Sequence, residues 1–500
     1  MKLCLINPPW TALKGYEDSI RVPFPLGLAY IASYLQKYGI EVKIIDTLAE
    51  GWRVRHSGES GIIRVGLPLS KITDIVSGFS PDAVGISCMF TSQSNNLHEV
   101  ANAVKKKLPD IPVIAGGAHA SAAPDAVLRD SNIDFAVQGE GEYTMLDLIR
   151  CFEGQIDIAG VKGIHYRVED KVVFTGQRPP IMDLDSLPLP AYDLLPMDEY
   201  FNSGKAGMSP RSVTSKKWMS VITSRGCPFM CNFCSVNLVS GRKWRARSPD
   251  NVLNELEYLV KKYDVKHIFF EDDNLTFDTT RAEEIFKGII DRGIDITWET
   301  PNGIRADRLT ENLVDSMKKS GCSGLTIAVE SGDQDFLYNT VKKNMDLKKL
   351  ESAVNLIKNK GIDLSAFFIL GIPGETEKTV TKTINFSRKL ARKGVRPYFN
   401  IAVPLIGTEM YRDARAKGYL IKEEPEPVDY LMAMQKPLLS TENYDPEKLL
   451  AWRKNAMMLA ALELVIHNPS SLLASETFLR LKKEPLSILK NVKILFRGTC

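Results

Sequence analysis

Three cysteines stand close together in the segment SRGCPFMCNFCS, residues 224–235. They are Cys227, Cys231 and Cys234, and the other cysteines among the chain's eight occur singly. Such usage is typical of a reduced, intracellular protein and not of a disulfide framework. Structural zinc usually takes four ligands from two C-x-x-C arms, and the sequence has no second arm. Three thiolates on one loop can instead bind three irons of a [4Fe-4S] cluster and leave the fourth iron open.

The elements around these cysteines alternate between short apolar strands and helical patterns. Six such units follow one another between residues 217 and 420, and the cysteines come directly after the first strand. Six units predict a partial (β/α)6 barrel, in which the C-terminal ends of the strands carry the chemistry. Polar signatures stand at these ends, namely the cysteines, EDDN at 271–274, Arg305, ESGD at 330–333, GIPGE at 371–375 and IGTE at 406–409.

Three further regions complete the predicted architecture. Residues 1–154 alternate strands and helices in a way that predicts a doubly wound, Rossmann-like parallel sheet. Residues 155–216 are predicted to be a connector with a small hairpin and a proline-rich segment, because repeated proline interrupts helices and central strands. Residues 421–500 have mostly helical periodicity. We therefore expect an α/β protein with an N-terminal Rossmann-like domain, a partial barrel at 217–420 and a helical C-terminal region.

The bulk properties are those of an ordinary soluble protein. The 500 residues carry a net charge of +3 with 44% hydrophobic residues, which points to no particular partner, and we expect no nucleic-acid binding. No apolar stretch approaches the roughly 20 residues of a membrane span or resembles a signal peptide, so we expect a cytoplasmic protein. Residues 478–500 interleave basic and apolar side chains, which suits either peripheral membrane contact and an amphiphilic substrate or a helical cap with a solvated face.

The pattern C-x-x-x-C-x-x-C after the first barrel strand resembles the radical S-adenosylmethionine (SAM) enzymes. The resemblance implies that the open iron binds SAM, whose cleavage gives a 5'-deoxyadenosyl radical. The turn at 404–408, PLIGT, departs from the family's P-x-P-G-T by an isoleucine. The residues that the resemblance implies as SAM contacts are Phe233, Glu271, Asp273, Arg305, Glu330, Ser331 and Gly371.

The N-terminal segments INPPW, PDAVGISCMFTSQ, IAGGAHAS and AVQGEGEYT resemble the cobalamin (B12)-binding domain of one radical SAM subfamily. The motif D-x-H-x-x-G, which would supply an axial imidazole, is absent from the sequence. A G-x-G-x-x-G after the first strand is also absent, which counts against NAD. Another nucleotide-like ligand, or a domain that only shapes the substrate cavity, remains an alternative. The residues implied as cobalamin contacts are Ser87, Gly116, Gly117, His119, Gly139 and Glu140.

The combined resemblance implies a cobalamin-dependent radical SAM methyltransferase that acts on an unactivated carbon. The substrate would be a small molecule, lipid-like or a tetrapyrrole, and a flavodoxin or ferredoxin would donate the electron. The alternatives are a radical cyclase or oxidase of a porphyrin or lipid, and a non-catalytic cobalamin-binding sensor or scaffold. No motif identifies the substrate or the residues that contact it.

Overall fold

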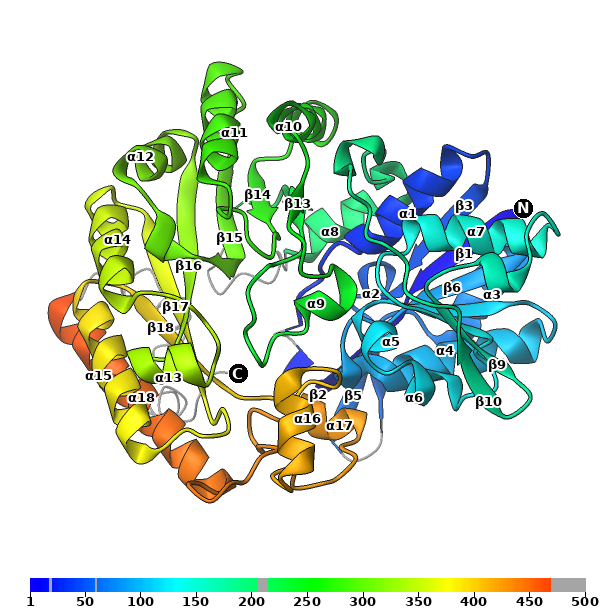
Figure 1. Ribbon diagram of the computed structural model, residues 1–500. Helices are drawn as coiled ribbons and strands as arrows, with labels where there is room; N and C mark the ends of the chain where they lie inside the picture. The colour runs from blue at the N-terminus through cyan, green and yellow to red at the C-terminus, as the bar shows by residue number, and fades with distance from the viewer. Residues whose placement is uncertain (18–19, 59–60, 205–214, 469–500) are drawn as a thin grey trace.

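The computed structural model describes residues 1–17, 20–58, 61–204 and 215–468. The basic and apolar segment 478–500 therefore lies outside the described residues. Two large sheets lie side by side, the N-terminal sheet at the right of Figure 1 and the barrel with its outer helices at the left. This arrangement confirms the expected α/β class.

The N-terminal sheet has seven strands in the order β10-β9-β8-β7-β6-β1-β3. Its first five strands along the chain are parallel, and their apolar residues are buried because helices cover both faces. The predicted hairpin adds the last two strands, since β9 pairs antiparallel with β8 and β10 pairs antiparallel with β9. The strands are β1 (Lys2–Asn7), β3 (Glu41–Asp46), β6 (Ala83–Ser87), β7 (Val113–Gly116), β8 (Phe135–Val137), β9 (Ile164–Val168) and β10 (Lys171–Phe174).

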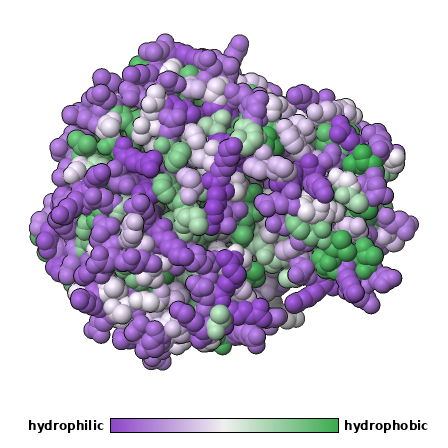
Figure 2. Space-filling model, viewed as in Figure 1, coloured by the Kyte–Doolittle hydropathy of each residue, from purple (hydrophilic) through white to green (hydrophobic). Residues whose placement is uncertain are grey.

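Helices pack on both faces of this sheet, and each face has its own hydrophobic core. Helices α1 (Leu26–Gln36) and α7 (Glu142–Phe152) cover one face, and their core continues into the barrel. Helices α3 (Leu69–Phe79) and α4 (Ser94–Lys107) cover the other face, whose core is separate. The hairpin leaves apolar side chains of β10 exposed, which form the hydrophobic patch at the lower right of Figure 2.

A small antiparallel sheet beside the first one was not predicted. It has the order β2-β5-β4, and its strands are β2 (Trp10–Leu13), β4 (Arg55–Ser57) and β5 (Ile62–Val65). The carboxamide of Gln93 fastens it to the main sheet, because its Oε1 accepts from the Thr11 amide at 2.7 Å and its Nε2 donates to the Thr11 carbonyl at 3.0 Å.

The barrel is one parallel sheet of six strands in the order β11-β14-β15-β16-β17-β18, and the described strands do not close it into a ring. This confirms the predicted partial (β/α)6 barrel. The strands are β11 (Trp218–Val221), β14 (His267–Phe270), β15 (Thr297–Ile304), β16 (Cys322–Glu330), β17 (Asp363–Leu370) and β18 (Arg396–Ile401). The outer helices are α10 (Pro249–Tyr263), α11 (Thr279–Asp291), α12 (Glu311–Lys319), α14 (Leu347–Asn359) and α15 (Glu377–Arg392).

The described part of the C-terminal region is largely helical. It contains α17 (Pro427–Leu431) and the long α18 (Pro446–His467), which packs against α15, and it follows α16 (Glu409–Ala416), the last helix of the barrel region. Among the described residues, no helix is both long enough and apolar enough to cross a bilayer.

Candidate functional site

The cysteine loop leaves the end of β11 and is closed at its base by a short two-stranded ribbon. β12 (Ser224–Arg225) pairs antiparallel with β13 (Arg245–Ala246), and α9 (Val236–Val239) follows the third cysteine. Gly226 has φ +83°, and a Cβ there would lie 2.5 Å from the Lys243 carbonyl oxygen, so the close return of the chain requires glycine. The three cysteines thus lie at the C-terminal end of a barrel strand, as predicted.

Asp272, which sequence reasoning did not single out, anchors the start of this loop. Its carboxylate accepts from the Thr223 amide at 2.6 Å, the Thr223 hydroxyl at 2.6 Å and the Ser224 hydroxyl at 2.7 Å. The side chain is buried, so an acceptor-only group is needed to satisfy three donors. The run of three acids in EDDN marks this segment as a candidate site, but the sequence alone does not show which of the acids faces the cysteine loop.

The two neighbouring acids, which were predicted to contact SAM, are held with raised pKa values. Burial raises the pKa of Glu271 to about 7, and the Ser220 hydroxyl donates to its Oε1 at 3.2 Å. Burial and the neighbouring Asp272 raise the pKa of Asp273 to about 6. The charge of Asp273 helps to raise the pKa of the Cys227 thiol, which indicates that Asp273 lies near the cysteine loop.

Arg305 lies beside the cysteine loop with one free donor. Its guanidinium stacks 4.0 Å from the ring centroid of Phe229, and its Nε and Nη2 donate to Asp307 at 3.1 and 2.7 Å. The remaining nitrogen, Nη1, is buried and has no hydrogen-bond partner among the described residues. An unsatisfied buried guanidinium nitrogen is costly, so it suits an anionic ligand such as the carboxylate of SAM.

Glu330 forms a buried ion pair with Lys343, a residue that no sequence motif singles out. The Lys343 Nζ lies 2.8 Å from the Glu330 Oε1, and both side chains are 7% exposed. Glu330 also has φ +66°, a left-handed conformation that is strained for a side-chain-bearing residue and is typical of functional sites. The ammonium of Lys343 therefore compensates the charge of a carboxylate that the barrel holds under strain.

Two of the other three predicted SAM contacts, Ser331 and Gly371, have hydrogen-bond partners within the chain. The buried Ser331 hydroxyl lies 2.9 Å from the Thr383 hydroxyl on α15. The Gly371 amide donates to Glu375 Oε2 at 2.6 Å, and its carbonyl accepts from the Tyr444 hydroxyl. Phe233 is half-buried and follows Asn232, which is fixed by backbone bonds to Val341 and Met410.

The donor set of the loop fits an iron–sulfur cluster. Burial raises the pKa of all three thiols, that of Cys234 to about 12, while Lys343 and Arg305 act to lower the pKa of Cys227 and Cys231. Thiolates bound to iron and faced by two cations suit this environment better than free buried thiols. Within the described chain, no three His, Cys, Asp or Glu side chains are arranged as ligands of one single ion.

The cobalamin residues predicted in the N-terminal domain gather at the C-terminal ends of β6, β7 and β8. A Cβ on Gly116 would meet no atom within 4 Å, so space is open there for a ligand. Gly117 has φ +98°, and its Cβ would lie 2.6 Å from the Cys88 carbonyl oxygen. Ser87 ends β6, and the Gly139 amide after β8 donates to Ser121 at 3.0 Å. An open strand edge of this kind fits a large planar ligand.

His119 lies at the same edge as a neutral, buried imidazole. Burial lowers its pKa to about 4, and its Nδ1 lies 3.1 Å from the Thr91 hydroxyl. The hydrogen bond fixes the ring orientation, as expected of either a structural histidine or one that faces a ligand.

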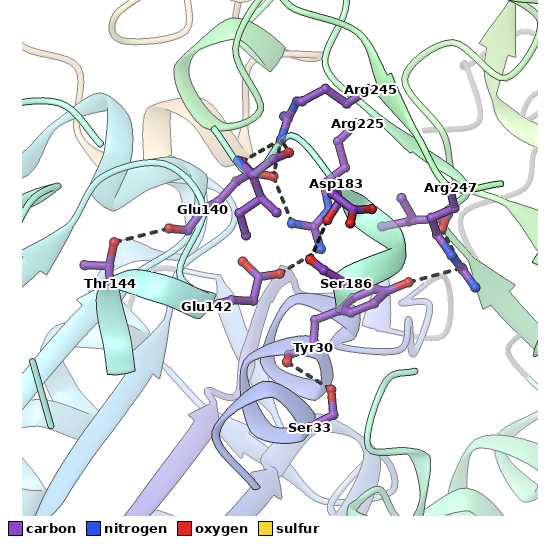
Figure 3. A network of polar contacts seen from close by, with 12 residues as sticks. Tyr30, Ser33, Glu140, Glu142, Thr144, Asp183, Ser186, Arg225, Arg245 and Arg247 are labelled. Carbon is purple, nitrogen blue, oxygen red and sulfur yellow. Dashed lines mark hydrogen bonds and ion pairs between the residues drawn. The ribbon is translucent and has the colours of Figure 1, made fainter. Parts of the chain in front are cut away.

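Glu140 links the N-terminal domain to the cysteine loop (Figure 3). Its Oε1 accepts from Arg225 Nη1 at 2.9 Å, and its Oε2 accepts from Arg245 Nη1 at 2.7 Å and from the Ile181 amide at 2.9 Å. Glu142 also accepts from Arg225, at 2.7 Å. We call this set of Glu140, Glu142, Arg225 and Arg245 the charge link. Both Glu140 oxygens carry partners, so its carboxylate is directed to the barrel.

The sequence matches two family models. Residues 22–149 match the B12 binding domain, and residues 221–387 match the radical SAM superfamily. The cytidylyl-2-hydroxyethylphosphonate methyltransferase of Streptomyces wedmorensis is 32% identical over 478 residues, which cover 90% of this chain and 88% of the relative. An uncharacterized methyltransferase of Pyrococcus horikoshii is 35% identical and covers 84% of each chain. An anaerobic magnesium-protoporphyrin IX monomethyl ester cyclase of Rubrivivax gelatinosus is 28% identical and covers 78% of this chain and 66% of the cyclase.

Two solved structures share the fold. The radical SAM methyltransferase TsrM from Kitasatospora setae, with cobalamin and a [4Fe-4S] cluster bound, has a TM-score of 0.67 at 16% identity and covers 92% of this chain and 88% of its own. The cobalamin-dependent radical enzyme OxsB with aqua-cobalamin bound has a TM-score of 0.72 at 19% identity and covers 99% of this chain and 72% of its own. At these identities the likeness concerns the fold.

Proposed function

This chain belongs to the cobalamin (B12)-binding-domain radical SAM family, and we propose that this methyltransferase acts on an unactivated carbon of a small molecule. Its cofactors are a [4Fe-4S] cluster, SAM and cobalamin. The observation that carries the proposal is the three-cysteine loop beside Arg305, facing a B12-binding domain across the charge link. When bound, the cluster and SAM supply a radical that removes hydrogen from the substrate, and cobalamin supplies the methyl group.

We assign the residues to these groups as follows. Cys227, Cys231 and Cys234 hold the cluster, and the free Nη1 of Arg305 receives the carboxylate of SAM. Phe233, Glu271, Asp273, Glu330, Ser331 and Gly371 remain predicted SAM contacts, and Ser87, Gly116, Gly117, His119 and Gly139 remain predicted cobalamin contacts. For Glu140 we propose a positioning role in place of a cobalamin contact, because both its oxygens are engaged.

The test of this function is SAM cleavage by the anaerobically reconstituted protein. We expect release of 5'-deoxyadenosine under reduction, and Cys231→Ala should abolish it because one iron loses its ligand. The control is Cys151→Ala, which removes a half-buried cysteine of α7 outside the loop and should keep the activity. Unchanged cleavage in Cys231→Ala would contradict the cluster assignment.

The product distinguishes methyl transfer from the cyclase alternative. The metabolite that accumulates in a deletion strain is identified and used as the substrate. The mass of the reaction product is then measured by mass spectrometry. A gain of one methyl group supports methyl transfer. Loss of two hydrogens without added carbon would support the cyclisation or oxidation of a porphyrin or lipid. The phosphonate named for the Streptomyces relative makes a small anionic molecule a third substrate class for this comparison.

We further propose that a flavodoxin or ferredoxin-type protein supplies the electron. Peripheral membrane contact through the C-terminal segment remains a prediction from its basic and apolar sequence. Co-sedimentation with anionic vesicles, comparing the full chain with a chain that lacks residues 470–500, tests it. Equal sedimentation of the two would contradict membrane contact through this segment.

A further inference from the structure

The cysteine loop reaches the surface at one side chain. Met230 lies directly before Cys231 and is 49% exposed, whereas the cysteines themselves are half-buried. Phe229, on the other side of Met230, is half-buried and packs against Phe277 with ring centroids 6.1 Å apart. The tip Phe229–Met230 is therefore an apolar surface one residue away from a cluster ligand.

Cations surround this tip. Arg242 Nη1 donates to the Phe229 carbonyl at 2.9 Å, and the Arg308 guanidinium lies 5.7 Å from the Phe229 centroid and 5.4 Å from that of Phe277. Lys243 follows Arg242 in a segment that runs beside the loop, because the Cys227 amide donates to the Gly241 carbonyl at 3.3 Å. Figure 2 shows hydrophilic side chains crossing the centre of this face, over the segment between α9 and β13.

The charge of these three cations is not neutralised nearby. Arg242, Lys243 and Arg308 are exposed, and none of them lies within 4.0 Å of a carboxylate in the described part of the chain. The adjacent acids have other partners, since Asp307 pairs with Arg305 and Asp278 caps the first turn of α11. The result is an apolar tip with a positive rim, which we call the tip surface.

We propose that the tip surface is the docking site of the protein that reduces the cluster, and that this partner is an acidic carrier with a low-potential one-electron centre. This inference rests on the proposed function, which requires such an electron. The carrier's centre loses one electron and the cluster gains it, and no proton or bond changes. Unpaired cations steer an acidic partner to this face, and the apolar tip lets the two centres approach closely. A small, transient interface is sufficient, as is usual for electron-transfer complexes.

The tip surface fits this partner better than a second copy of the chain. The chain has a net charge of +3, so the rim would repel a like surface of another copy. Anionic vesicles and nucleic acid would also be attracted to cations, and both are included as competitors in the test.

The test uses the full chain reconstituted with its cluster and the double variant Lys243→Glu/Arg308→Glu. Arg242 is left in place because its side chain supports the Phe229 carbonyl. The matched control is Lys319→Glu/Lys349→Glu, which makes the same charge change at exposed positions of α12 and α14 on the barrel's outer helices. Iron content and the electron paramagnetic resonance spectrum establish that all three proteins hold the same cluster.

Two quantities are measured with a reduced, acidic flavodoxin as the probe. We expect the tip variant to raise the Kd for the flavodoxin about tenfold or more, with a smaller effect at high salt because surface charges are then screened. Flavodoxin-driven SAM cleavage should fall by a similar factor, whereas cleavage driven by dithionite, which needs no docking surface, should stay unchanged. The control variant should behave as the unaltered protein in both assays.

Equal Kd values for the tip variant and the control would overturn the docking site. In the competition assay, vesicles or DNA are added to the flavodoxin complexes of the unaltered protein and of the tip variant. Equal release of flavodoxin from both complexes would also overturn the docking site. The binding measurement does not depend on catalysis. Absence of dithionite-driven cleavage in the unaltered protein would therefore contradict the proposed function and leave the docking result to be judged by Kd alone.

Discussion

At the scale of single residues, neighbouring acids of one motif acquire different roles from their surroundings. Asp272 satisfies three donors from Thr223 and Ser224 and fixes the start of the cysteine loop. Glu271 and Asp273 have few donors, and burial raises their pKa values. A carboxyl group whose pKa lies near neutral pH can accept a hydrogen bond from a ligand ammonium in its ionised form. In its protonated form it can stay buried without a partner when the site is empty.

Glu375 gives a pH prediction at this scale. Its side chain is buried, its Oε1 has no partner among the described residues, and burial raises its pKa to about 8 from the ordinary 4.5. Because the folded-state pKa is the higher one, the folded protein binds the proton more tightly. The stabilising contribution is complete below about pH 4.5 and is lost as the pH rises through about 8, at up to about 1.4 kcal/mol per pH unit.

The variant Glu375→Gln, which mimics the protonated acid, should flatten this dependence. The free energy of unfolding is measured by urea denaturation at about pH 6 and about pH 8, and the unaltered protein should lose more stability than the variant between the two. Equal losses in both proteins would contradict a buried, protonated Glu375.

Residues of the site were predictable where a local pattern carries them. The spacing of Cys227, Cys231 and Cys234 indicates the cluster without reference to the rest of the chain, and Arg305 stands at a strand end. Lys343 was not predictable because no local motif includes it, although its partner Glu330 lies 13 positions earlier, and the role of Glu140 was not predictable because its partners are distant in sequence. Glu140 and Arg225 are 85 residues apart, and nothing in a one-dimensional pattern tells that their side chains meet.

At the scale of elements, the charge link joins the turn between β8 and α7 to the ribbon β12–β13 at the base of the cysteine loop (Figure 3). Arg245 is 1% exposed and Glu140 8% exposed, so the pair lies out of water. Removal of one partner from a buried pair leaves an uncompensated charge. The position of the cysteine loop therefore depends on the N-terminal domain.

The variant Glu140→Gln should destabilise the protein by about 3 kcal/mol and lower the iron bound per folded chain, because Arg225 and Arg245 lose their carboxylate. The matched control is Glu463→Gln on α18, where a 7% exposed carboxylate likewise bridges two arginines, Arg388 and Arg392, on α15. Both variants should unfold more easily in urea. Only Glu140→Gln should change the iron content and the cluster's paramagnetic resonance spectrum, and identical spectra in both variants would contradict a positioning role.

The six barrel units were predictable because each strand is a compact apolar run followed by a helix of clear periodicity. The sheet β2-β5-β4 was not, since its strands have three or four residues and β2 pairs with a strand about fifty positions later. Strands of this length are too short for an alternation of apolar and polar residues that would distinguish them from a loop. Their formation depends on contacts such as those of Gln93 with Thr11.

At the scale of the whole molecule, the two sheets share one hydrophobic core. That core runs from Leu3 and Leu5 of β1 through α1 and the connector to the barrel strands. Two connector tyrosines reinforce it, since the Tyr192 hydroxyl donates to Glu255 at 2.6 Å and the Tyr200 hydroxyl donates to Asp46. Phe24 and Trp218 add an edge-to-face contact with centroids 4.9 Å apart.

A shared core predicts that both domains unfold as one unit. Amide hydrogen exchange followed by mass spectrometry should give the same opening free energy for peptides of β1 and β16, each of which has a neighbouring strand on both sides in its sheet. Tyr200→Phe removes the donor of a buried carboxylate, Asp46, and should lower that free energy by about 1 to 3 kcal/mol. In a single cooperative unit the loss appears equally in β1 and in β16, although the hydrogen-bond partner of Tyr200, Asp46, belongs to the N-terminal sheet. Loss confined to β1 would mean that the domains open independently, and the distance between the C-terminal edge of the N-terminal sheet and the cysteine loop would then not be fixed by the fold.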